Sequence, residues 1–342
     1  MLKKMVISVA AVAMLAVSAV PAHADPKFTP AATDLVGVGS DTTQDVLNAL
    51  ATGYNAAHPG KPKLASFDAT PKGSKIKPKA GAATIERPDG SSAGIKALQN
   101  DADGALDFAR SSRAKKADGT EAALTFFPFG QDGVTWATHY QTNAPKSLSK
   151  SQLASIYRCS AKARYWDQVG GKKVKGKRQK IQPYLPQLGS GTRSFFLGAI
   201  GLTDAQVGSC VNGKLQENDG KVLPKGNKNY IAAYSIGKWI AQAVNKKNDR
   251  HGTTVLHQIA KQNPTTGSLK IDKKGKVTGK NVRINTGDFP RTFLRFVFNV
   301  VRTADAAKFE PVFGATGWVC DQPGTIRAYG FEPLGGGCGL PQ

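Results

Sequence analysis

The sequence is short of metal ligands and of long apolar runs. Its 342 residues include four cysteines, five scattered histidines and three methionines, and no two cysteines form a Cys-x-x-Cys pair. Zinc sites place such ligands at short fixed spacings, so we expect no metal and no cofactor. No His-Glu-x-x-His motif occurs, so we also expect that the protein is not an enzyme. Beyond residue 24 no segment is apolar enough to cross a membrane.

The N-terminus carries the features of an export signal. Lys3 and Lys4 precede an apolar run over residues 5–17, and the small-residue segment Ala22-His23-Ala24 follows it. This order predicts a Sec signal peptide over residues 1–24 with cleavage after Ala24. No cysteine follows the apolar run to take a lipid anchor. We therefore expect a secreted, extracellular protein.

Acidic residues are few compared with basic ones. Asp and Glu number 24 against 47 Lys and Arg, which gives a formal net charge of +23. Such an excess favours anionic partners, from small oxyanions to anionic surface polymers, phospholipid and nucleic acid. Two basic clusters stand out, and their members are Lys172, Lys173, Lys175, Lys177, Arg178 and Lys180 in one and Lys270, Lys273, Lys274, Lys276 and Lys280 in the other.

All four cysteines follow the signal peptide, at Cys159, Cys210, Cys320 and Cys338. An even count in an exported chain predicts two disulfides. Three pairings are open. We favour Cys159–Cys210 with Cys320–Cys338, because each bond then closes the simplest local loop.

Apolar periodicity predicts an α/β fold with largely parallel sheets, because expected strands alternate with expected helices. Two further strands are expected at 124–129 and 134–139, on either side of Gly130–Gly133. Asp132 in this segment either contacts a ligand or fixes the turn before Gly133, and we favour the turn. A strand crossing is expected within 289–301. The other main expectations are strands at 35–38, 105–109 and 181–185 and helices at 42–54, 93–98 and 230–244.

Three loops share one composition, being small, rich in hydroxyl groups and placed before an expected helix. They are Gly39-Ser40-Asp41-Thr42, Gly90-Ser91-Ser92 and Gly189-Ser190-Gly191-Thr192. A helix start has free backbone N–H groups and a positive dipole end, and glycine lets an oxyanion approach the backbone. The alternative is that these residues are plain helix N-caps.

The order of the motifs resembles the PstS-like phosphate-binding proteins of phosphate ABC transporters, which have a type II periplasmic-binding-protein fold. The resemblance runs through most of the chain after the signal peptide. The segments that carry it are 37–42, 90–96, 107–112, 127–134, 148–157 with 165–167, 189–195, 218–220 and 289–290.

The resemblance implies two lobes joined by two crossing strands. Lobe 1 would comprise residues 25–138 and 291–342, and lobe 2 residues 139–290. The ligand-contacting positions carried over from the family, together with two neighbours, are Ser40, Asp41, Thr42, Ser91, Ser112, Ser190, Gly191, Thr192 and Arg193.

Two positions depart from the family pattern. Ser112 stands where the family has an aspartate that accepts the proton of hydrogen phosphate, and Pro186 stands where it has an arginine. Serine both donates and accepts hydrogen bonds, so discrimination between phosphate and sulfate is expected to relax. Arg110, Arg113 and Arg193 are candidates to replace the missing positive charge, because arginine binds oxyanions in a bidentate manner.

The sequence thus predicts a monomeric solute-binding protein. It would capture a small oxyanion, which the resemblance implies is phosphate, and deliver it to an ABC transporter permease. The alternative keeps the fold but makes the basic surface the functional part, as a secreted adhesion module for cell-wall polymer, phospholipid or nucleic acid.

Overall fold

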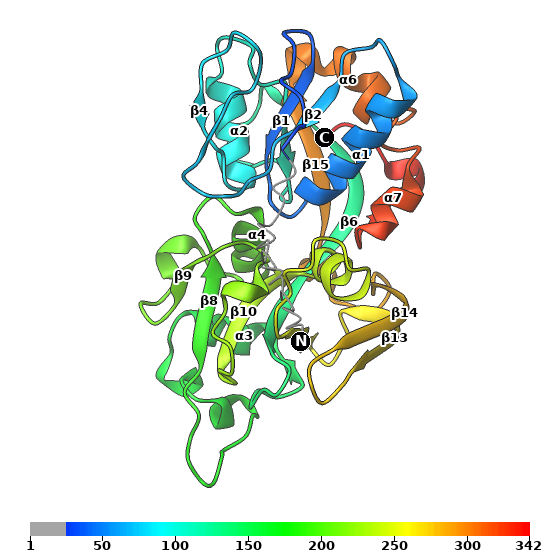
Figure 1. Cartoon of the computed structure of the whole chain (residues 1–342). Helices are drawn as coiled ribbons and strands as arrows, with labels where there is room; N and C mark the ends of the chain where they lie inside the picture. The colour runs from blue at the N-terminus through cyan, green and yellow to red at the C-terminus, as the bar shows by residue number, and fades with distance from the viewer. Residues whose placement is uncertain (1–24) are drawn as a thin grey trace, which may run out of the picture.

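A computed structural model describes residues 25–342, so the predicted signal peptide lies outside the described residues. The chain forms two α/β lobes that lie end to end (Figure 1), confirming the predicted two-lobed α/β fold. One sheet runs through both lobes in the order β2-β1-β5-β15-β6-β10-β8-β9, with β11 and β16 also pairing with β6.

Lobe 1 contains the parallel strands β1, β2 and β5 between two layers of helices. The amphipathic helix α1 buries Val46, Leu47, Leu50 and Tyr54, as the sequence predicts. It packs with α6 and α7 on one face of the sheet, whereas α2 covers the other face. The bounds are β1 Leu35–Gly39, α1 Gln44–Ala57, β2 Leu64–Ser66, β3 Lys75–Ile76, β4 Ile85–Glu86, α2 Ser91–Asn100, β5 Phe108–Ser111, α6 Ala306–Phe313, α7 Pro323–Ala328 and β16 Glu332–Pro333.

Two long antiparallel strands, β6 (Leu124–His139) and β15 (Leu294–Arg302), connect the lobes. The expectation of two strands flanking a turn at 130–133 is wrong, because β6 is continuous and pairs with β15 through this region. Gly133 permits close packing there, since a Cβ would lie 2.8 Å from Ile236 Cδ1. The lobe boundaries expected after residues 138 and 290 fall beside the lobe 2 ends of these strands.

Lobe 2 builds on β8, β9 and β10, with an exposed hairpin formed by β13 and β14. The sequence predicts a helix over residues 230–244. This prediction is wrong for the first part, because Tyr230–Ser235 is the fully buried strand β10. A strand buried on both faces lacks polar alternation and reads like a buried helix. The bounds are β7 Ser147–Leu148, α3 Lys150–Tyr157, β8 Gln182–Pro186, α4 Gly191–Ile200, β9 Asn212–Leu215, β10 Tyr230–Ser235, α5 Ile236–Trp239 followed by a π-helical turn Ile240–Val244, β11 Thr254–Leu256, β12 Gln258–Ile259, β13 Thr265–Ile271 and β14 Val277–Ile284.

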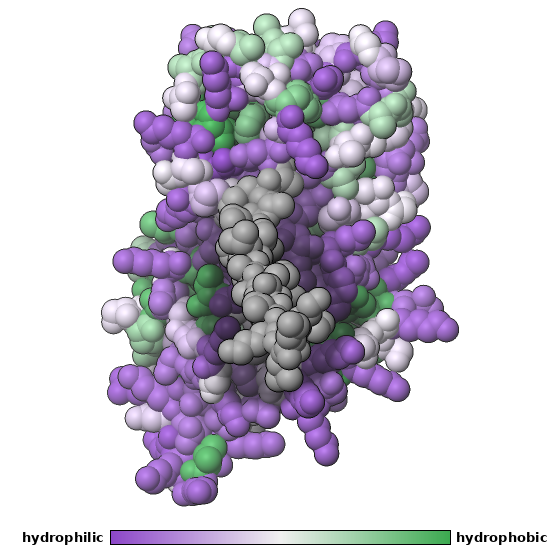
Figure 2. All heavy atoms as spheres, viewed as in Figure 1, coloured by the Kyte–Doolittle hydropathy of each residue, from purple (hydrophilic) through white to green (hydrophobic). Residues whose placement is uncertain are grey.

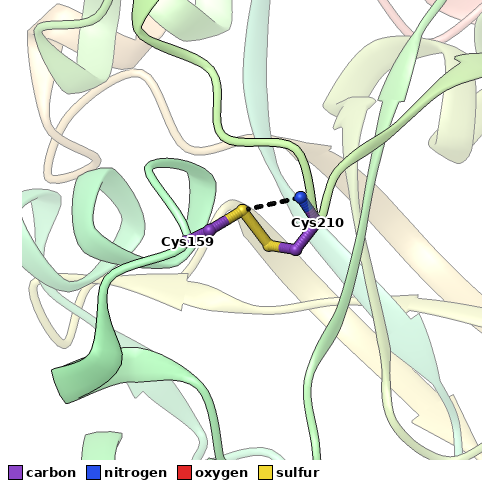
Figure 3. Close-up of a disulfide and its surroundings, with 2 residues drawn as sticks. All are labelled: Cys159 and Cys210. Carbon is purple, nitrogen blue, oxygen red and sulfur yellow. Dashed lines mark hydrogen bonds between the residues drawn. A yellow bond between two sulfur atoms is a disulfide. The ribbon is translucent and has the colours of Figure 1, made fainter.

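Both predicted disulfides are present. Cys159–Cys210 ties the end of α3 to the loop before β9 in lobe 2 (Figure 3), where the Cys210 N–H also donates to Cys159 Sγ at 3.1 Å. Cys320–Cys338 closes the C-terminal segment against lobe 1. Each bond lies within one lobe, so neither restrains movement between the lobes.

Candidate functional site

The three loops singled out by the sequence meet between the lobes. Ser91 at the start of α2 and Ser112 after β5 lie with their hydroxyl oxygens 3.2 Å apart, and the Ser112 N–H donates to Ser91 Oγ at 2.9 Å. Gly191 of lobe 2 packs against this pair, because an added Cβ would lie 2.4 Å from both hydroxyl oxygens. Nearby, Thr42 Oγ1 and Thr192 Oγ1 approach to 3.2 Å across the interface. We call this group of contacting residues, Thr42, Ser91, Ser112, Gly191 and Thr192, the interlobe seat.

Helix α4 directs its first turn at the interlobe seat. Ser190 is its N-cap, and its side chain accepts from the Arg193 N–H at 3.0 Å, so the plain capping role holds for this serine. Thr192 is the second residue of the helix, where the backbone N–H has no partner within the helix. This N–H instead donates to an acceptor outside α4, and the positive end of the helix dipole favours an anionic one.

The acceptor is Glu217, in the loop between β9 and β10, a residue that the sequence analysis did not single out. Its Oε1 accepts from the Thr192 N–H and from Thr42 Oγ1, both at 2.9 Å. Glu217 is 1% exposed, and its Oε2 is buried without a hydrogen-bond partner. The one available signal was its position directly before the recognised segment Asn218-Asp219-Gly220.

The arginine at the site is Arg295 of β15, which the sequence analysis also missed. Its Nε and Nη2 donate to Asp132 Oδ2 at 3.1 and 2.8 Å, and Nη2 also donates to Thr192 Oγ1 at 2.9 Å. Its Nη1 is buried without a partner. Asp132 also accepts from Ser235 Oγ and from the Gly237 N–H. The interpretation of Asp132 as a turn residue is therefore wrong: it orients the arginine that contacts Thr192.

The three arginines proposed from the sequence have other partners. Arg110 donates to Ser66 Oγ at 2.8 Å and to the Ser40 carbonyl at 3.2 Å, so it fixes the strand ends of lobe 1. Burial lowers its pKa to about 10. The other two form ion pairs within their own lobes, Arg113 with Glu121 and Arg193 with Asp204. Arg193 Nη1 also donates a hydrogen bond to the Pro186 carbonyl at 3.0 Å. The three guanidinium groups that were expected to contact the ligand are thus bound to other groups of their own lobes.

The first hydroxyl-rich loop, residues 39–42, contributes to the interlobe seat less directly than expected. Ser40 Oγ is buried without a hydrogen-bond partner, and Asp41 accepts a long 3.4 Å bond from Asn218. Burial raises the pKa of the Asp41 carboxyl well above its usual range; Lys238 opposes the rise, and Glu217 adds to it. Lys238 of lobe 2 also bridges the lobes, because its Nζ donates to Asp45 at 2.5 Å and to the Asp41 carbonyl at 3.2 Å.

Several further bonds hold the lobes together around the interlobe seat. Asp89 of lobe 1 accepts from Gln187 and Gln216 of lobe 2 at 2.8 and 3.0 Å. The Ser92 N–H donates to the Gly189 carbonyl at 3.0 Å. Beside Glu217 lies a cavity of about 250 Å³ with both lobes in its lining, including Lys72, Asn218 and Arg250.

Two α/β lobes, two crossing strands and a polar seat closed between them define a two-lobed binding protein. Residues 26–308 match the family model of the PBP superfamily domain, and the chain belongs to this superfamily. No curated protein matches the sequence.

Two similar solved structures share this fold. One is an ABC-type phosphate transport receptor from Vibrio cholerae, with 21% sequence identity, a TM-score of 0.56, and coverage of 87% of this chain and 99% of that one. The other is a Clostridium perfringens protein crystallised with bound phosphate, with 18% identity, a TM-score of 0.60, and coverage of 88% and 99%.

Within residues 25–342, each helix is too short or too polar to cross a bilayer. In the same range no three His, Cys, Asp or Glu side chains come together in a group that could hold a metal ion.

Proposed function

We propose that the protein captures a small oxyanion, phosphate in the first instance, in the interlobe seat and presents it to an ABC transporter. One observation carries this proposal: the seat already holds a carboxylate oxygen, Glu217 Oε1, between the Thr192 N–H and the Thr42 hydroxyl. Donors from both lobes therefore converge on one oxyanion position. An anion there is stabilised by the N-terminus of α4.

The remaining hydroxyl groups suit a tetrahedral anion. Ser91 and Ser112 lie on the lobe 1 side of Gly191, while Thr192 Oγ1 accepts from Arg295 and can direct its own proton toward a ligand. The similar Clostridium perfringens fold contains phosphate, which supports phosphate as the first ligand to test. Because Ser112 stands where the family has an aspartate, and serine can donate to a fully ionised anion, we expect sulfate to bind as well.

A captured ligand is favoured over the alternative of a basic adhesion surface. Hydrophilic side chains dominate the face seen in Figure 2, and the cluster Lys172–Lys180 lies in an exposed loop of lobe 2. Exposed lysines are the ordinary solvated surface of a basic protein, whereas convergent buried donors need a ligand or a substitute for one. Export and action as a monomer are further parts of the proposal.

Binding without catalysis is also part of the proposal. Gly90–Gly94 has the Gly-x-Ser-x-Gly spacing of a hydrolase nucleophile elbow, which the sequence analysis overlooked. Here the segment begins α2, and Ser92 Oγ accepts from Arg113 Nε at 3.0 Å rather than pairing with a base.

Isothermal titration tests the proposal, using protein that has been unfolded and refolded to strip carried ligand. We expect heat from phosphate with the wild type and at least tenfold weaker binding with Thr192→Val, which loses a hydroxyl group at constant shape. Thr266→Val, an exposed threonine on β13, is the matched control and should bind as the wild type does. Absence of phosphate and sulfate binding, both in the wild type and in a variant lacking the Glu217 carboxylate, would contradict the proposal.

A further inference from the structure

We infer that Glu217 is a built-in substitute for the ligand: its carboxylate occupies the position of one ligand oxygen, holds the lobes together and competes with the entering anion. Glu217 would thereby set the affinity and specificity of the site. This inference rests on the proposed function, since it concerns the same interlobe seat.

The first support is the identity of the donors. Glu217 Oε1 lies 2.9 Å from both the Thr192 nitrogen and Thr42 Oγ1, which is the hydrogen-bonding distance that a phosphate oxygen would adopt with these donors. A phosphate oxygen at this position would coincide with Glu217 Oε1. The carboxylate and the ligand therefore exclude each other.

The second support is that the carboxylate bridges the lobes. Glu217 belongs to lobe 2, but one of its two donors, Thr42, belongs to lobe 1. Asn218, the next residue, adds a 2.9 Å bond from Nδ2 to the same threonine hydroxyl oxygen. A ligand in a two-lobed binding protein closes it by contacting both lobes at once, and here a side chain of the protein does so.

The third support is electrostatic. No cation forms an ion pair with Glu217 among the salt bridges of the described residues, because Arg295 pairs with Asp132 and Lys238 pairs with Asp45. The Asp41 carboxyl is also close enough for Glu217 to raise its pKa. An entering anion would meet this charge in a buried site, where repulsion is strong. Binding therefore requires Glu217 to leave.

The surroundings allow it to leave without unfolding the loop. The Glu217 N–H is held by Gln187 Oε1 at 2.9 Å, so the backbone is anchored independently of the carboxylate. Glu217 itself lines a cavity of about 250 Å³, which offers room for the displaced side chain. Rotation of one side chain would then exchange the internal carboxylate for the ligand.

Two probes, phosphate and formate, test this inference. They are applied to the wild type, to Glu217→Ala and Glu217→Gln, and to a control variant, Glu86→Ala, which removes an exposed carboxylate from lobe 1. Titration with phosphate should give a dissociation constant at least about tenfold tighter for Glu217→Ala than for the wild type, because the competing state is removed. Glu217→Gln, which keeps the shape and loses the charge, should also bind more tightly, and Glu86→Ala should match the wild type.

The second probe is formate, a carboxylate small enough to replace the missing group. Formate should raise the melting temperature of Glu217→Ala and leave the wild type and Glu86→Ala unchanged, because a ligand stabilises only the protein that has a vacant site. No formate effect specific to Glu217→Ala, or phosphate affinity equal to that of the wild type, would overturn the inference while leaving phosphate binding intact. Formate rescue without phosphate binding by any variant would instead reject phosphate as the ligand and support the role of Glu217.

Discussion

Gly191 offers a sharp test of whether the lobes close over the interlobe seat. A Cβ at this position would lie 2.4 Å from Ser91 Oγ and from Ser112 Oγ, about 1 Å inside the 3.4 Å at which ordinary contact begins. In Gly191→Ala the two hydroxyl groups must rotate away, which breaks the bond from the Ser112 N–H to Ser91 Oγ, or the lobes must stay apart. Overpacking of this kind costs about 1–3 kcal/mol, which corresponds to about 5- to 150-fold weaker ligand binding.

Gly198 on the same helix is the matched control. A Cβ there meets nothing within 4 Å, so Gly198→Ala should keep ligand affinity and gain up to about 1 kcal/mol of stability from helix propensity. Titration with phosphate measures the affinity, and small-angle X-ray scattering measures the radius of gyration. We expect weaker binding and a larger radius for Gly191→Ala alone. Equal affinities and equal radii for the two variants would refute the closed packing at Gly191.

Three further predictions concern stability. Arg295→Met leaves the buried Asp132 carboxylate without its guanidinium partner and should lower the free energy of unfolding by about 3–5 kcal/mol; a loss below about 1 kcal/mol in urea unfolding would contradict this. Burial lowers the pKa of His257 from 6.5 to about 4. The neutral imidazole therefore contributes to the free energy of unfolding in full above pH 6.5, and this contribution is lost as the pH falls toward 4. Wild type should therefore lose up to about 3 kcal/mol over this range relative to His257→Gln, and parallel stability curves would count against it. Replacing Cys159 and Cys210 by serine opens a loop of 51 residues and should cost about 4 kcal/mol, measured as a lower melting temperature; an unchanged value would oppose the estimate.

The fold could be predicted where local pattern and global structure agree. Helix α1 shows its buried face in its periodicity, and the hydroxyl-rich loops do lie at strand and helix ends. The pairing of Cys159 with Cys210 followed from simple loop closure. The turn predicted at 130–133 was wrong because glycines usually mark turns, whereas here they allow close packing within a strand that crosses both lobes.

The predicted site was incomplete because its charged residues come from distant parts of the chain. Arg295 precedes the apolar core of a crossing strand, and its role depends on register with Asp132, which is set by strand pairing over 163 residues of separation. Glu217 lies in the long loop between β9 and β10, outside any helix or strand. Conversely, Arg110 was proposed because it is close in sequence to Ser112, but alternation along β5 directs it into lobe 1.

Native mass spectrometry of refolded protein with added phosphate tests the central claim most directly. The wild type should retain one phosphate per molecule at saturating concentration, Glu217→Ala should retain it at about tenfold lower concentration, and a variant that combines Thr42→Val with Thr192→Val should retain none. If all three proteins retained phosphate equally, or if none of them retained it, the result would contradict an oxyanion site between the lobes.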